Sequence, residues 1–212
     1  MQKNSLGYLV WIGFAALLLS GYAGLSALDL RHELKQEPLI LDVAPIQQSL
    51  GTSCGEAAIT MVVNFTNPGG PINESEVIEY AAEQGYYTEA SEPFTSPANM
   101  VRIARHYSQT VESGHVLSAE AGLKLIHQNL QAGKPVIIDV PVHLSDSDSS
   151  AHFVVINGLS VDTQQENSFI IHYIDPLTGR QETASWSGEA GIWYGWMNNT
   201  DPGGSGWWLV LS

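Results

Sequence analysis

The chain contains a single cysteine, Cys54, and it stands where a thiol could act as a nucleophile. It cannot form an intramolecular disulfide, and apolar residues at helical spacing begin directly after it and continue to about residue 65. Ser53 or Thr52 would serve as the N-cap of that helix, and Glu56 suits its first turn. The positive end of a helix dipole favours the thiolate, which is the nucleophilic form of cysteine. We therefore predict a reactive thiol rather than a buried structural cysteine.

Thiol acyl transfer also needs an imidazole and a group that orients it. Among seven histidines, His152 begins a hydrophobic strand predicted over residues 152–159, after a polar loop, at a point that would expose its ring. Asp175 ends the next predicted strand, residues 169–174, and antiparallel pairing would bring it near His152. The ordinary alternatives are a solvated or core histidine and an Asp-Pro turn. A cysteine on a helix start followed by His and Asp on strands favours a thiol peptidase.

An oxyanion donor is the remaining requirement of this chemistry. Gln48 lies six residues before Cys54, and its side-chain amide could donate a hydrogen bond together with the backbone N–H of Cys54. Gln47 is the rival, and the spacing alone does not exclude it.

The candidate residues belong to a set of short motifs that resembles a known family. The motifs are Gln48, residues 54–58, residues 133–137, residues 151–158, and Asp175-Pro176 with Gly179. Together they resemble the bacteriocin-processing, double-glycine leader peptidases, family thirty-nine of the cysteine peptidases, and within it the stand-alone branch. The resemblance extends over about residues 41–211.

The resemblance implies an α+β, papain-like fold, with the cysteine at a helix N-terminus and the His and Asp on an antiparallel sheet. It also implies a Cys–His–Asp triad with an oxyanion glutamine, carried here by Cys54, His152, Asp175 and Gln48. The best-known members are fused to an exporter with an ATPase. This sequence has one apolar segment and no Walker-type loop, so processing of exported leader peptides is not implied.

The order of the predicted elements also indicates an α+β domain. We expect an extended segment over residues 39–43, helices over residues 54–65, 74–83, 97–107 and 118–130, and strands over residues 134–140, 152–159, 169–174, 180–186 and 207–211. Residues 85–96 are expected to be irregular. The Trp-rich stretch over residues 186–208 would either fill the core or line a substrate cleft.

The first 28 residues differ in character from the rest of the chain. No charged residue occurs between Asn4 and Leu28, and Lys3 precedes the apolar run. We predict a membrane anchor or signal peptide over residues 1–28, a linker over residues 29–38, and a peptidase domain over residues 39–212. Positive charge before the run and acidic residues after it place the domain outside the cytoplasm, either tethered to the membrane or secreted.

Charge and composition limit the classes of partner and cofactor that we expect this chain to bind. The formal net charge is −14, from 8 Lys+Arg against 22 Asp+Glu, which argues against nucleic-acid binding. We expect no cofactor and no metal, because residues 146–150 lack the glycine and distal glutamate of a calcium loop and no histidines stand at zinc-ligand spacing. The expected partner is a peptide or protein substrate, besides the membrane at the N-terminus. The alternatives are a catalytically silent domain that binds a peptide or protein, and a thiol acyltransferase.

Overall fold

The computed structural model describes residues 27–163, 168–199 and 201–212. The predicted anchor or signal peptide, residues 1–28, therefore lies almost wholly outside the described residues. Among the helices that the structure does describe, none is both long enough and apolar enough to cross a bilayer.

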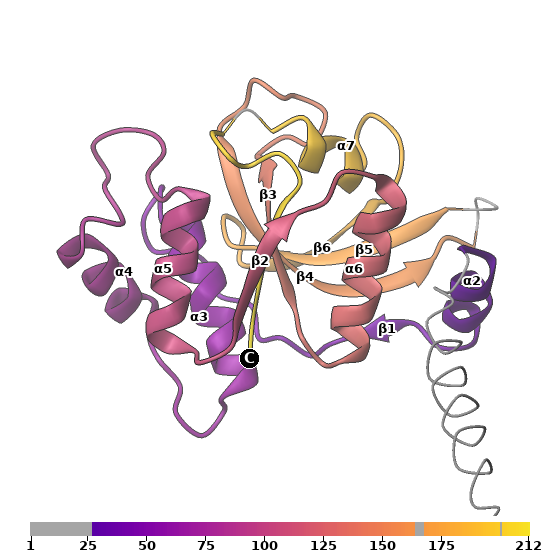
Figure 1. Cartoon of the computed structure of the whole chain (residues 1–212), viewed down its shortest axis with the longest axis horizontal. Helices are drawn as coiled ribbons and strands as arrows, with labels where there is room; N and C mark the ends of the chain where they lie inside the picture. The colour runs from indigo at the N-terminus through magenta and orange to yellow at the C-terminus, as the bar shows by residue number, and fades with distance from the viewer. Residues whose placement is uncertain (1–26, 164–167, 200) are drawn as a thin grey trace, which may run out of the picture.

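A seven-stranded antiparallel sheet runs through the domain (Figure 1). The spatial order is β2-β7-β3-β4-β5-β6, and β1 pairs with β4 outside this path. The strands are β1 (Leu39–Ile40), β2 (Val111–His115), β3 (Val136–Pro141), β4 (Ala151–Val161), β5 (Phe169–Asp175), β6 (Arg180–Ser185) and β7 (Trp207–Leu211). Every pairing in the sheet is antiparallel, as the α+β prediction requires.

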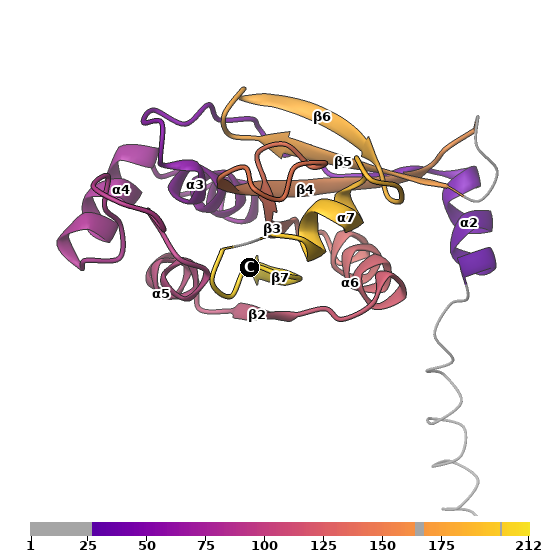
Figure 2. The same cartoon turned by 90° about the horizontal axis from the view of Figure 1, so that it is seen from above.

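Helices pack on both faces of this sheet and form two hydrophobic cores (Figure 2). They are α2 (Ala27–Gln36), α3 (Cys54–Thr66), α4 (Glu74–Glu83), α5 (Pro97–Tyr107), α6 (Ala119–Gln131) and α7 (Ile192–Met197). Side chains of α3, α4 and α5 belong to one core, and those of α2, α6 and α7 belong to the other.

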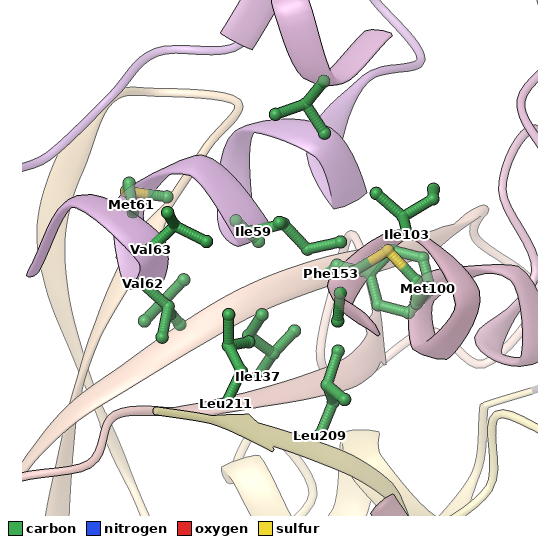
Figure 3. Packing of buried hydrophobic residues seen from close by; sticks show 14 of the residues in the cluster. Ile59, Met61, Val62, Val63, Met100, Ile103, Ile137, Phe153, Leu209 and Leu211 are labelled. Carbon is green, nitrogen blue, oxygen red and sulfur yellow. The ribbon is translucent and has the colours of Figure 1, made fainter. Parts of the chain in front are cut away.

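The alternation of strand side chains explains why one sheet serves two cores. On β3, Ile137 joins the core under α3 while Ile138 joins the opposite core, and on β4 the same division separates Val155 from Ile156. Figure 3 shows the core under α3, where Ile59 and its helical neighbours meet apolar residues of the sheet. Because both faces are covered, residues 136–138 of β3 and residues 153–156 of β4 are uninterrupted apolar runs rather than alternating ones.

The expected linker over residues 29–38 is largely helical instead. Leu30 and Leu34 on α2 are buried and pack in the core shared with β4, α6 and α7. Their i, i+4 spacing puts them on one face of the helix, so a segment that is mostly polar still has an apolar stripe. β2 and α7 were not anticipated either, because neither carries a strong local periodicity.

The Trp-rich region contributes to the core. Trp186 and Trp196 are buried, and the indole N–H of Trp196 donates to the backbone oxygen of Trp207 at 2.6 Å. The rings of Trp186, Trp193 and Trp196 contact one another beside Gly122, where an added Cβ would lie 3.1–3.2 Å from all three rings. Of the two readings of this region, the structure therefore favours the core.

Candidate active site

Cys54 is the first residue of α3, as the sequence predicted, and its side chain is half-buried. The helix is anchored by apolar residues that are fully buried against the sheet, so the position of the thiol is set by the core beneath it. Ser53 occupies the N-cap position, but its side chain makes no capping hydrogen bond. The predicted N-cap position is therefore confirmed, but the hydroxyl of Ser53 forms its hydrogen bonds elsewhere.

His152 and Asp175 meet across the pairing of β4 with β5. The register sets Val155 opposite Ile174, and Asp175 is the next residue of β5, so it lies beyond this pair toward the end of β4 that carries His152. Nε2 of His152 lies 2.6 Å from Oδ1 of Asp175. The antiparallel pairing predicted from the sequence thus produces the predicted imidazole–carboxylate contact. The expected exposure of the His152 ring is wrong, because the residue is buried and only 6% exposed.

The charges of this pair follow from their surroundings. Burial acts to lower the pKa of His152, but the hydrogen bond to Asp175 and the interactions with Cys54 outweigh it and raise the pKa to about 10. Burial alone would raise the pKa of Asp175, yet the hydrogen bond and charge of His152 hold it below its ordinary value, with help from the backbone N–H of Leu177 at 2.8 Å. The pair is therefore an imidazolium beside a carboxylate at neutral pH.

The third member of the cluster is the thiol itself. A hydrogen bond and a charge interaction with Cys54 are among the causes of the raised pKa of His152, so the two side chains are within reach of each other. Because Asp175 occupies Nε2, the ring nitrogen left for the sulfur is Nδ1. Cys54, His152 and Asp175, which are up to 121 residues apart in sequence, thus form one connected cluster.

Gln48 lies in the loop that leads into α3. Its Nε2 donates to the backbone oxygen of Leu50 at 2.8 Å, while its Oε1 is buried without a hydrogen-bond partner. Its backbone N–H donates to the oxygen of Pro176 at 2.8 Å, so this loop is hydrogen-bonded to the turn that follows Asp175. Gln47 is exposed, and its amide lies 3.4 Å from the oxygen of Leu177.

A glycine allows this loop and the turn after Asp175 to approach each other closely. Gly179 has φ +63°, a left-handed conformation that side chains disfavour. A Cβ there would lie 2.6 Å from Cβ of Gln47 and 3.0 Å from its backbone, so only glycine lets the turn approach this closely. The turn that carries Asp175 and the loop that carries Gln48 are packed as one unit.

A cavity of about 290 Å³ opens beside Cys54. Glu92, Asp148 and Asp201 contribute to its lining, together with Gly55 and other neutral residues, and no lysine or arginine of the described chain lines it. Glu92 and Asp148 come from loops that the sequence left irregular, and no local pattern marks such residues as cavity-lining. Within the described residues, no group of three or more His, Cys, Asp or Glu side chains is placed to hold a metal ion.

Glu56 lies next to this cavity and is completely buried. Its Oε1 accepts a hydrogen bond of 2.7 Å from the hydroxyl of Thr95, and its Oε2 has no partner. Burial is the main cause that raises the pKa of Glu56 to about 7, and the charge of Glu74 adds to it. The sequence pattern places Glu56 only in the first turn of a helix, because a local pattern does not show whether that position is buried.

Comparison with known families agrees with this geometry. The model of the Peptidase_C39 like family matches residues 40–198, which is most of the chain and includes every member of the cluster. The chain belongs to the Peptidase_C39 like family. This confirms the family resemblance found in the sequence, and the helices and antiparallel sheet described above fit an α+β domain of this papain-like peptidase family. No curated protein matches the chain.

Proposed function

We propose that this Peptidase_C39-like domain is an active thiol peptidase, with Cys54 as nucleophile, His152 as acid and base, Asp175 as the orienting carboxylate and Gln48 as an oxyanion donor. The observation that carries the proposal is the 2.6 Å contact between His152 and Asp175, together with the hydrogen bond between the same imidazole and Cys54. An imidazolium beside a thiol at a helix N-terminus stabilises a thiolate.

The proposed reaction begins when the Cys54 sulfur attacks the carbonyl carbon of a peptide bond and its electron pair moves onto the oxygen. The backbone N–H of Cys54 and an N–H of the Gln48 amide stabilise that oxyanion. Gln48 donates one N–H to Leu50, and in this proposal the second N–H of the amide serves the oxyanion. The oxyanion then collapses, the C–N bond breaks, and His152 gives its proton to the departing amine.

Hydrolysis of the resulting thioester returns the site to its starting state. His152, now neutral, takes a proton from a water molecule, whose oxygen attacks the thioester carbon. A second oxyanion forms and collapses, the carboxylic acid departs, and thiolate and imidazolium are restored. Asp175 stays ionised throughout and fixes the orientation of the ring.

The cavity beside Cys54 gives the substrate chain a place to lie, and its acidic lining matches a peptide better than a nucleic acid. An acyltransferase would use the same thioester with an amine acceptor in place of water, and a silent domain would only bind in the cavity.

The deciding experiment is hydrolysis of a peptide library by the wild-type chain and by Cys54→Ser. We expect the wild type to cleave some members and Cys54→Ser to fold normally, as judged by its melting temperature, but to cleave none. Alkylation of Cys54 at pH 6–7 should be faster than that of an ordinary thiol, whose pKa is near 8.5. A thiol that reacts only after denaturation, or cleavage that persists in Cys54→Ser, would refute the proposal. Products joined to an added amine would instead indicate the acyltransferase.

We further propose that the domain works outside the cytoplasm, tethered to a membrane or secreted. The support is the uncharged, apolar run between Asn4 and Leu28, with Lys3 before it and acidic residues after it.

A further inference from the structure

Glu74, the first residue of α4, binds the loop that enters the candidate site. The backbone N–H of Ser49 donates to its carboxylate, at 3.1 Å to Oε1 and 3.0 Å to Oε2. The hydroxyl of Ser53 donates to Oε1 at 2.7 Å. One half-buried carboxylate on a neighbouring helix thus accepts hydrogen bonds from both ends of the loop over residues 49–53.

The two donors stand directly beside the residues assigned to the oxyanion. Ser49 follows Gln48, and Ser53 precedes Cys54. Inside the loop, the N–H of Leu50 donates to the Ser53 hydroxyl at 3.1 Å, and the oxygen of Leu50 accepts from the amide of Gln48 at 2.8 Å. A chain of hydrogen bonds therefore runs from Glu74 through Ser53 and Leu50 to the Gln48 amide.

The same contact explains why Ser53 does not cap α3. A serine at an N-cap normally accepts from the N–H groups of the first turn. Here its hydroxyl is completely buried and engaged by Glu74 and Leu50, and it makes no capping bond. The first N–H groups of α3, beginning with that of Cys54, are thus not taken up by the serine that precedes them.

We propose that Glu74 is a positioning residue for the oxyanion donors: it holds residues 49–53 so that the Gln48 amide and the Cys54 N–H point to the same place. This rests on the proposed function, because it assumes that an oxyanion forms at Cys54. A displacement of about 1 Å in such a group costs on the order of a hundredfold in rate. Glu74 does not touch the substrate, so its effect should be selective for reactions that build an oxyanion.

The chemistry of the contact predicts a graded series of variants. Glu74→Ala removes both acceptors and leaves the buried Ser53 hydroxyl without its shortest partner. Glu74→Gln keeps one acceptor oxygen but replaces the other with an N–H group and removes the charge that strengthens both bonds. Ser53→Ala removes only the link through the hydroxyl. Glu79→Ala, on an exposed position of the same helix, is the matched control.

The test compares two reactions of Cys54. Acylation by a nitrophenyl ester builds an oxyanion, whereas alkylation by iodoacetamide does not. We expect Glu74→Ala to slow acylation about 10- to 100-fold while alkylation changes less than about twofold. Glu74→Gln and Ser53→Ala should fall between Glu74→Ala and the wild type, and Glu79→Ala should match the wild type. In peptide cleavage the same series should lower kcat with little change in KM.

Each outcome bears on the proposal. Equal slowing of acylation and alkylation, or unchanged acylation in folded Glu74→Ala and Glu74→Gln, would overturn the positioning role. The double variant Glu74→Ala/Ser53→Ala should be no slower in acylation than Glu74→Ala alone. If the two single-variant rate reductions multiply fully in the double variant, the positioning role is also contradicted. If the wild type cleaves no peptide, the proposed function fails, but the ratio of acylation to alkylation still decides whether Glu74 positions the donors.

Discussion

At the scale of single residues, the charge on His152 is the property that the rest of the candidate site depends on. A buried imidazole would ordinarily be neutral. The pKa of His152 is instead raised to about 10, because the ring interacts with Asp175 and Cys54. Asp175→Asn keeps the shape of the side chain but removes its charge. We therefore expect the pKa of His152 to fall, and alkylation of Cys54 at pH 6–7 to slow.

The pH dependence of stability tests the same pair independently. A histidine whose pKa is raised in the folded state contributes stability that is fully present below its unfolded pKa of about 6.5 and is lost as pH rises through about 10. The free energy of unfolding of the wild type should therefore fall between pH 7 and 10 more steeply than that of Asp175→Asn. Parallel curves from urea denaturation would contradict this, and Asp42→Asn, at an exposed position, is the control.

Gln48 should act only while charge develops on the substrate oxygen. Removal of one oxyanion donor costs on the order of a hundredfold in turnover, roughly 3 kcal/mol. Gln48→Ala should lower kcat by that amount with little change in KM, and Cys54 should still alkylate readily. Gln47→Ala is the matched control, and steady-state kinetics should be measured for both variants. If kcat falls in Gln47→Ala and not in Gln48→Ala, the oxyanion donor has been assigned to the wrong residue by one position.

At the scale of elements, α3 carries both the candidate nucleophile and a buried acid, Glu56. Because its pKa is raised to about 7, the folded state holds this proton more tightly than the unfolded state, and stability is lost as pH rises from about 4.5 through 7. Glu56→Gln keeps an oxygen to accept from Thr95 but does not ionise. The stability of Glu56→Gln relative to the wild type should therefore be greater at pH 8 than at pH 5, by at most about 3 kcal/mol.

Chemical denaturation at the two pH values measures this difference directly. A constant difference between wild type and Glu56→Gln would mean that Glu56 ionises as an exposed carboxyl does. Glu79→Gln is a suitable control, because the side chain is exposed on α4.

At the scale of the whole molecule, an acidic domain follows an N-terminal segment that has no charged residue between Asn4 and Leu28. The proposed location predicts that protease added to spheroplasts reaches the domain and that Lys3 stays on the cytoplasmic side. Fractionation wholly with the cytosol would contradict the proposal. N-terminal sequencing adds a second readout, because a product that begins near Gly24 would indicate signal cleavage rather than an anchor.

The sequence by itself determined the features that depend on local spacing. The helix beginning at Cys54, the strands that carry His152 and Asp175, and the antiparallel approach of those two residues follow from periodicity and chain order. The family assignment also follows from these motifs, and the match over residues 40–198 confirms it. Such features can be predicted from the sequence, because each involves neighbours along the chain or two consecutive strands.

Only the tertiary structure decided which contacts form between segments that are distant in the sequence. It packs Leu30 and Leu34 of the expected linker into a core, buries Glu56 beside Thr95, and brings Glu74 to Ser53 in place of a helix cap. A serine before a helix has the same local sequence whether its hydroxyl caps the helix or binds a carboxylate 21 residues away. Which bond forms depends on how α4 packs against α3, and that packing is a property of the whole core rather than of any segment.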